Sequence, residues 1–80
     1  MKELVEILAK SLVDFPEKVQ VTEKNDDKGV VINLYVAPED MGKVIGKQGK
    51  IAKSIRSVVK AAAFKDNKKV LLEIDQISNE

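Results

Sequence analysis

The chain has 80 residues, of which 44% are apolar and 34% charged, and its formal net charge is +1. This length allows one domain with a single small core, and the apolar fraction excludes a disordered chain. His and Cys are both absent, which excludes the usual zinc sites, disulfides and imidazole-based catalysis. We therefore expect no enzyme activity, no small-molecule substrate, no metal and no cofactor. Short, interrupted apolar runs and early acidic residues predict neither a membrane span nor a signal peptide.

The first expected element is an amphipathic helix over residues 2–13. Leu4, Leu8 and Leu12 recur at helical spacing, while charged residues fall elsewhere. Pro16 is expected to end this segment, because the residue before a proline is pushed out of the helical region.

Two strands joined by a polar turn are expected next. Val19 and Val21 alternate with polar residues, which is typical of a strand. Residues 25–29 are polar and end in glycine, which predicts a turn that pairs the two strands antiparallel. Residues 30–36 are apolar on both faces except at Asn33, a pattern that suits the central strand of a sheet.

A pair of helices around a glycine loop is expected after the second strand. Pro38 favours the first turn of a short helix, and Gly46 is expected to end that helix. A longer helix begins near Gly49. Its core-facing stripe is expected to comprise Ile51, Ile55, Val58, Val59 and Ala62.

The last expected element is a strand over residues 70–74, after a polar loop at 65–69. The order is therefore α-β-β-α-α-β, and a right-handed crossover makes the second and third strands parallel. We predict an α+β fold in which three helices cover one face of a three-stranded mixed sheet. The single domain spans residues 1–80, with an ordered core over about 2–75 and a frayed tail over 76–80.

Positive charge is concentrated in one segment of the chain. Residues 41–65 hold seven basic residues and no acid, whereas the other 55 positions hold seven basic residues against 13 acids. Such asymmetry indicates an anionic partner more strongly than the overall charge does. The same segment contains Gly46-Lys47-Gln48-Gly49, and a Gly-x-x-Gly loop is one way to bring backbone amides close to phosphates.

This loop is the candidate binding site, and single-stranded nucleic acid is the expected ligand. Gly46 is expected to adopt a left-handed conformation, and Gly49 to let a sugar-phosphate backbone approach. Lys47 and Lys50 would add charge, Gln48 a polar contact, and the amides that open the following helix would face a phosphate.

Apolar residues beside the loop are expected to form the floor of a groove for bases. These residues are Val44, Ile45 and Ile51. Aromatic residues make up only 4% of the chain, which disfavours an aromatic stacking platform.

Each of these features has a plain alternative. A Gly-x-x-Gly sequence arises by chance and also makes a tight turn between helices that binds nothing. Lys53, Arg56 and Lys60 would then form a solvated helix face, and Gly42 is expected to be a packing site for the short helix. P-loop and Rossmann spacings fail at this loop. A helix-turn-helix is disfavoured because strands flank the helix pair and lysines occupy the loop.

The segment Val44–Ile51 resembles the Ile-Gly-x-x-Gly core of KH domains, and the N-terminal helix gives the order of the type II arrangement. A wider resemblance, to the KhpA family of small stand-alone bacterial KH proteins, covers about residues 1–74. It is carried by residues 12–14, 36–40, 42–49 and 55–56. Lys50 stands where this family often has Arg, which keeps the charge but loses bidentate phosphate geometry. Phe15 stands where a polar residue is common.

This resemblance implies cytoplasmic binding of single-stranded RNA, over about four nucleotides. It also implies a complex with a larger KH-containing protein of the Jag (KhpB) type. Because an 80-residue monomer has little surface to hold RNA, avidity favours a second KH unit, from a homodimer or from such a partner. The implied role is post-transcriptional control or RNA chaperoning linked to cell shape and cell-wall homeostasis. The expected RNA-binding residues are Lys43, Val44, Ile45, Gly46, Lys47, Gln48, Gly49, Lys50, Ile51 and Lys53.

Two alternatives stay open at this point. The first is a KH-fold interaction module that acts mainly through dimerisation or partner docking. The second concerns the ligand, because the sequence does not distinguish RNA from single-stranded DNA.

Overall fold

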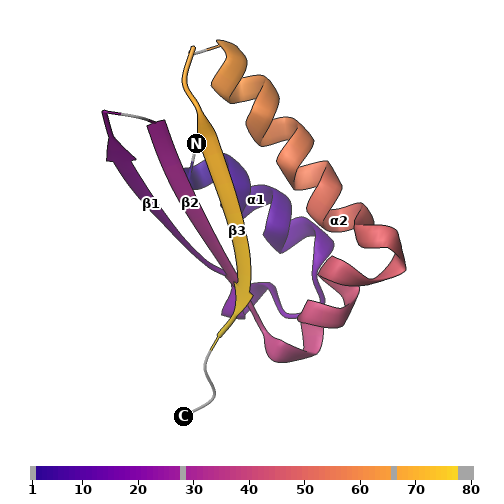
Figure 1. Cartoon of the computed structure of the whole chain (residues 1–80). Coiled ribbons are helices and arrows are strands. Elements are labelled where there is room, and N and C mark those ends of the chain that lie inside the picture. Colours follow the sequence, from indigo (N-terminus) through magenta and orange to yellow (C-terminus); the bar gives the residue numbers. More distant parts are fainter. Residues whose placement is uncertain (1, 28, 66, 78–80) are drawn as a thin grey trace.

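The structure is a computed structural model that describes residues 2–27, 29–65 and 67–77. A three-stranded sheet is accompanied by helices on one side (Figure 1). The elements in chain order are α1 (Lys2–Leu12), the 3-10 helix η1 (Pro16–Lys18), β1 (Gln20–Asp26), β2 (Gly29–Val36), α2 (Pro38–Lys65) and β3 (Val70–Gln76). Strand β2 is central, antiparallel to β1 and parallel to β3. The predicted α+β fold with a mixed sheet is confirmed.

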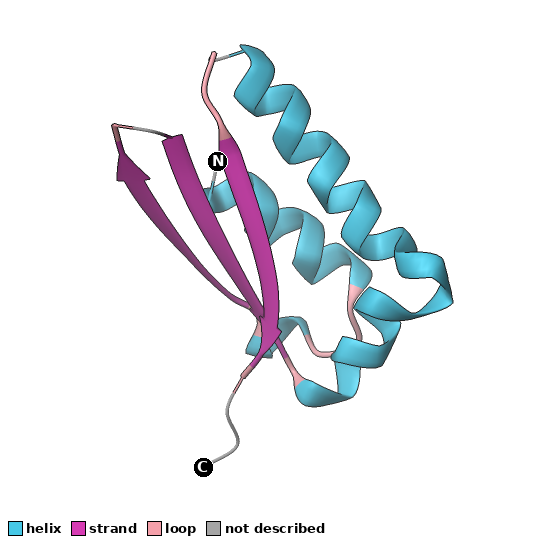
Figure 2. Cartoon of the chain, in the orientation of Figure 1, coloured by secondary structure: helices cyan, strands magenta, loops and turns pink. Residues whose placement is uncertain are grey.

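The core lies between one face of the sheet and the two α-helices (Figure 2). Side chains of β2 alternate, because successive residues of a strand point to opposite faces. Val30, Ile32, Leu34 and Val36 are buried in the core, while the residues between them are only half-buried. The central position predicted for this strand follows from that pattern.

The β1–β2 connection is tighter than expected. Asn25 pairs with Val30 and Asp26 with Gly29, so both strands extend into the polar stretch predicted to be a turn. Backbone hydrogen bonds pair the strands of a hairpin even where the side chains at its exposed end are polar. The prediction ended both strands too early because it relied on that polar composition.

The C-terminal end of the sheet also extends further than expected. Gln76 is the last residue of β3, and the Ile77 amide donates a hydrogen bond to the Val36 carbonyl at 2.9 Å. The expectation of a frayed tail is therefore wrong for residues 76 and 77, because they are held by the central strand. Residues 78–80 lie outside the described part of the chain.

The two helices expected around the glycine loop form one continuous helical element, α2. The helix does not end at Gly46, and the left-handed residue is Gly49, with φ +67°, rather than Gly46. One left-handed residue redirects the chain while its neighbours keep helical geometry. Figure 1 shows the result as a sharp bend between a short first arm (residues 38–48) and a long second arm (residues 50–65).

The core-facing stripe of the second arm is shifted from the one predicted. Ile55 and Val59 are buried as expected, but Val58 is 37% exposed, and Ile51 and Ala62 are half-buried. The buried row instead runs through Ala52, Ile55, Val59 and Ala63. The small alanines let the helix pack close to the sheet. The predicted stripe omitted Ala52 and Ala63 because alanine is only weakly hydrophobic.

A buried carboxylate fixes the first arm of α2 against the rest of the molecule. Asp40 is fully buried, and its two carboxylate oxygens accept hydrogen bonds from the Asp14 and Phe15 amides, each at 3.0 Å. This contact was not predicted from the sequence. The contact between Asp40 and the α1–η1 connection joins segments far apart in sequence and positions the arm that leads to the bend.

None of the described helices is both long enough and apolar enough to cross a membrane.

Candidate nucleic-acid interface

The bend in α2 is open to solvent. A Cβ atom added at Gly46 or Gly49 would meet no heavy atom within 4 Å beyond the adjoining backbone. The bend lies at the outer edge of the molecule, away from β1 (Figure 1). The glycines predicted to bind a ligand are therefore not covered by the protein's own side chains.

The two glycines of the loop have different local reasons to be glycine. Gly49 has φ +67°, a conformation that costs other L-residues about 1–2 kcal/mol. Gly46 has neither a positive φ nor a close neighbour. Gly42, expected to be a packing site, likewise has open space where a Cβ would lie, so that prediction is wrong.

Basic side chains follow the bend along the second arm. Lys50 and Lys53 are exposed, as are Arg56 and Lys60 further along. Lys53, Arg56 and Lys60 are spaced three and four residues apart, which places them on one side of a helix. The side chains of residues 47 and 48 lie outside the described part of the structure.

Lys43, another of the predicted cations, is engaged within the protein. Its Nζ lies 3.0 Å from Oδ1 of Asp14, and both side chains are exposed. An exposed pair of this kind is weak, at about 0–1 kcal/mol, so an incoming phosphate can compete for the lysine.

The apolar floor predicted beside the loop is only partly formed. Val44 is fully buried in the core and presents no surface to a ligand, so its assignment as a contact residue is wrong. Ile45, one position on, is 54% exposed, and Ile51 is half-buried against the core. Successive helical residues point in directions about 100° apart, so Val44 and Ile45 do not share a surface.

A groove that sequence analysis missed lies between the second arm of α2 and β3. It has a volume of about 220 Å³. Its lining residues are Arg56, Val59, Lys60, Val70, Leu71 and Leu72. Apolar side chains line the groove together with Arg56 and Lys60, which suits a ligand with flat apolar groups on an anionic backbone. Half of this lining comes from β3, which is why inspection of the glycine loop alone did not find it.

A three-stranded mixed sheet with helices on one face, and a helix bent at a Gly-x-x-Gly, together define a KH domain of the type II arrangement. The sequence profile described as "KhpA/KhpB, KH domain" matches residues 2–74. The chain therefore belongs to the KhpA/KhpB family of KH domains.

Relatives in several bacteria support this assignment over nearly the whole chain. RNA-binding protein KhpA of Clostridium perfringens is 68% identical over 74 residues, which are 92% of this chain and 99% of the relative. The protein of the same name in Clostridium acetobutylicum is 62% identical over the same shares of the two chains. The one in Aquifex aeolicus is 51% identical, over 92% of this chain and 94% of the relative. No solved structure gives a significant match to the chain.

Proposed function

We propose that this protein binds single-stranded RNA at the bend of α2. The observation that carries the proposal is the open space over Gly46 and Gly49, beside the exposed cations Lys50 and Lys53. Relatives that share half to two-thirds of its residues are named RNA-binding proteins, which supports RNA as the ligand.

The backbone of the bend supplies a way to hold a phosphate. Gln48 is helical and Gly49 is left-handed. A right-handed residue followed by a left-handed one turns successive amides toward a common point, which makes an anion-binding nest. The same amides open the second arm, where the helix dipole favours negative charge. Lys50, which is exposed, adds mobile positive charge beside that point.

The second arm and β3 provide the path for the rest of the strand. Lys53, Arg56 and Lys60 follow the bend on one side of the helix and lead to the α2–β3 groove. We propose that phosphates follow these cations while bases lie against Val59 and the neighbouring β3 side chains. Ile45 and Ile51 contribute apolar surface next to the bend. A KH domain holds about four nucleotides in this way.

The test is a double substitution in the loop, Lys47→Asp with Gln48→Asp. It should abolish RNA crosslinking in cells and RNA binding in vitro, while the circular dichroism spectrum stays native. The matched control is Lys24→Asp with Gln20→Asp, which makes the same change of charge on the exposed face of β1. Unchanged crosslinking of the loop variant would refute the proposal.

A second candidate function, docking of another protein chain, is favoured by apolar exposure on the second arm. Phe64 is 87% exposed and Val58 is 37% exposed, with the exposed Ala61 between them. We propose that this face serves a homodimer or a larger KH-containing partner of the Jag (KhpB) type. Substituting Val58 and Phe64 with Ser should lower the mass measured by light scattering, or abolish partner pull-down. If the assembly is unchanged, docking lies elsewhere.

We further propose a cytoplasmic role in post-transcriptional control or RNA chaperoning, linked to cell shape and cell-wall homeostasis. This role rests on the family resemblance. A deletion strain complemented with the loop variant should keep the shape defect of the deletion, whereas the Lys24/Gln20 control should correct it. Fractionation should find the protein in the cytoplasm.

A further inference from the structure

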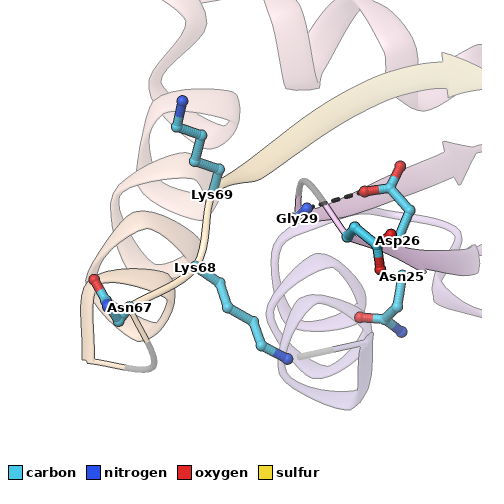
Figure 3. Close-up of a pocket in the computed structure, with 7 residues that line it drawn as sticks. Asn25, Asp26, Gly29, Asn67, Lys68 and Lys69 are labelled. Atoms are coloured by element: carbon cyan, nitrogen blue, oxygen red, sulfur yellow. Dashed lines mark hydrogen bonds between the residues drawn. The ribbon is translucent and has the colours of Figure 1, made fainter.

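A hollow lies at the opposite end of the second arm from the bend. It has a volume of about 400 Å³ and lies between the end of the β1–β2 hairpin and the α2–β3 loop (Figure 3). Residues 25–27 and Gly29 form one wall, and residues 67–69 form the other. We call it the end pocket. We propose that it binds one nucleotide of the RNA strand that enters at the bend, an inference that rests on the proposed function.

The walls of the end pocket are fixed to each other by backbone contacts. The Val30 amide donates to the Lys69 carbonyl at 2.8 Å, which joins the hairpin to the loop. The Gly29 amide donates to Oδ1 of Asp26 at 3.0 Å, which holds the hairpin end in shape. The pocket is therefore formed before any ligand arrives, as ligand sites usually are.

The α2–β3 loop is held just as firmly by the end of the second arm. Asn67 is left-handed, with φ 56°. Its amide donates to the Phe64 carbonyl at 3.1 Å, and the Lys68 amide donates to the Ala63 carbonyl at 2.9 Å. This pair of bonds is the Schellman ending of a helix, with Asn at the position that glycine usually takes. It fixes the point on the backbone from which the Lys68 side chain extends.

The two walls carry complementary polar groups. The loop wall presents Lys68, whose side chain extends toward the hairpin side in Figure 3. The hairpin wall includes Asp27 and Asn25, and the side-chain NH2 of Asn25 also donates a hydrogen bond to Oε2 of Glu23 at 3.2 Å. An ammonium group pairs with a phosphate, while carboxylate and amide oxygens accept hydrogen bonds from the exocyclic amino groups of adenine, cytosine or guanine. A nucleotide of adenine, cytosine or guanine has both a phosphate and an exocyclic amino group, whereas a uracil nucleotide has only the phosphate.

The end pocket is linked to the groove that follows the bend through shared lining residues. It shares Asp26, Gly29 and Lys69 with a smaller hollow of about 190 Å³. That hollow in turn shares Val70 and Leu71 with the α2–β3 groove. The hollows thus form a series along the start of β3.

The experiment measures how RNA length changes the RNA affinity of the native protein and of a charge-neutral double variant, Lys68→Ala with Asp27→Ala. Removing one charge of each sign keeps the net charge, so long-range attraction of RNA is preserved. Affinity is measured by fluorescence anisotropy for oligonucleotides of about four and about ten nucleotides. The native protein should bind the longer RNA roughly tenfold more tightly, because a second site on the same strand adds avidity. The variant should lose that gain and bind the short RNA as the native protein does.

The matched control removes another pair of opposite charges, Lys10→Ala with Glu6→Ala on α1. It should keep the gain with length, and thermal unfolding should show that both variants are folded. An equal gain in the native protein and the end-pocket variant would overturn the inference. The proposed function would still stand if Lys47→Asp with Gln48→Asp abolishes binding at both lengths, so the two failures are distinguishable.

Free nucleotides carry the same phosphate and base groups as an RNA strand. They therefore test whether the end pocket takes a free nucleotide or part of a strand. In amide NMR spectra, AMP, CMP or GMP should shift the signals of Gly29, Asn67 and Lys68 at lower concentration than UMP. Equal shifts by all four would overturn the recognition of the amino group. Shifts without any gain from RNA length would overturn the RNA strand as the occupant.

Discussion

Gly29 and Gly46 both lie in regular secondary structure, one at the start of β2 and the other inside α2. At Gly29 the backbone has φ +149°, and an added Cβ would overlap the carbonyl oxygen of Lys69. At Gly46 the backbone is helical and an added Cβ would meet nothing. The protein's own structure requires the first glycine and does not require the second.

This difference separates two reasons for a glycine. A glycine inside a helix costs roughly 0.5–1 kcal/mol relative to alanine, because its backbone loses more freedom on folding. At Gly46 no internal contact offsets this cost. A partner whose backbone must approach the helix is then the simplest physical reason for the missing side chain. The predictions below test this contrast.

The largest effect is expected for Gly29→Ala. A backbone conformation suited only to glycine, together with the threatened Val30–Lys69 hydrogen bond, should cost about 2–4 kcal/mol of unfolding free energy. Urea denaturation measures this loss. The fraction that stays folded should bind short RNA with native affinity. Asn25→Ala, in the same hairpin, is the control and should change stability by at most about 0.5 kcal/mol. A stable Gly29→Ala protein would show that the hairpin end relaxes freely.

Gly49→Ala should have the next largest effect on stability. Forcing alanine into the left-handed region costs about 1–2 kcal/mol, and thermal or urea unfolding will record it. Gly49→Asn is the control, because asparagine tolerates this conformation better. If the two variants were equally stable, the bend would not depend on a left-handed residue at this position.

Much of the fold could be predicted from the sequence because its signals are local. Residues 30–36 are apolar on both faces, which indicated a central strand and hence the order of the sheet. The spacing Gly46–Gly49 located the bend, but the left-handed residue is Gly49 and not Gly46 as predicted. That choice depends on the path of the whole chain between β2 and the second arm.

The unpredicted parts of the site depend on contacts between segments distant in sequence. Asp40 reaches Asp14 and Phe15 across more than 20 positions, and the α2–β3 groove needs both elements in place. Val44 and Ile45 are both apolar, so composition could not show that only Ile45 reaches the surface.

Gly46→Ala should change stability and binding in opposite directions. Stability should rise by roughly 0.5–1 kcal/mol, because alanine is the better helix former and its Cβ meets open space. RNA affinity should fall on the order of tenfold, about 1.4 kcal/mol, because the methyl group occupies space needed by the strand. Calorimetric unfolding and anisotropy titration measure the two effects.

Gly42→Ala is the matched control for that prediction. Gly42 is exposed, helical and open in the same way, but lies one turn before the loop. It should gain similar stability and keep native RNA affinity. Native affinity in Gly46→Ala as well would remove the argument that this glycine is reserved for a partner.

The smallest effect concerns salt, and it reports how many phosphates the bend and its cations hold. Each phosphate neutralised on a single strand releases counterions and contributes about −0.7 to the slope of log K against log salt. Two or three contacts around Lys50 and Lys53 predict a slope of about −1.4 to −2.1. Lys50→Gln should make the slope shallower by about 0.7, whereas Lys24→Gln on β1 should leave it unchanged.

Gly46→Ala should weaken binding without altering the slope, because it removes space and no charge. An affinity independent of salt would mean that the exposed cations of the second arm do not contact the RNA backbone.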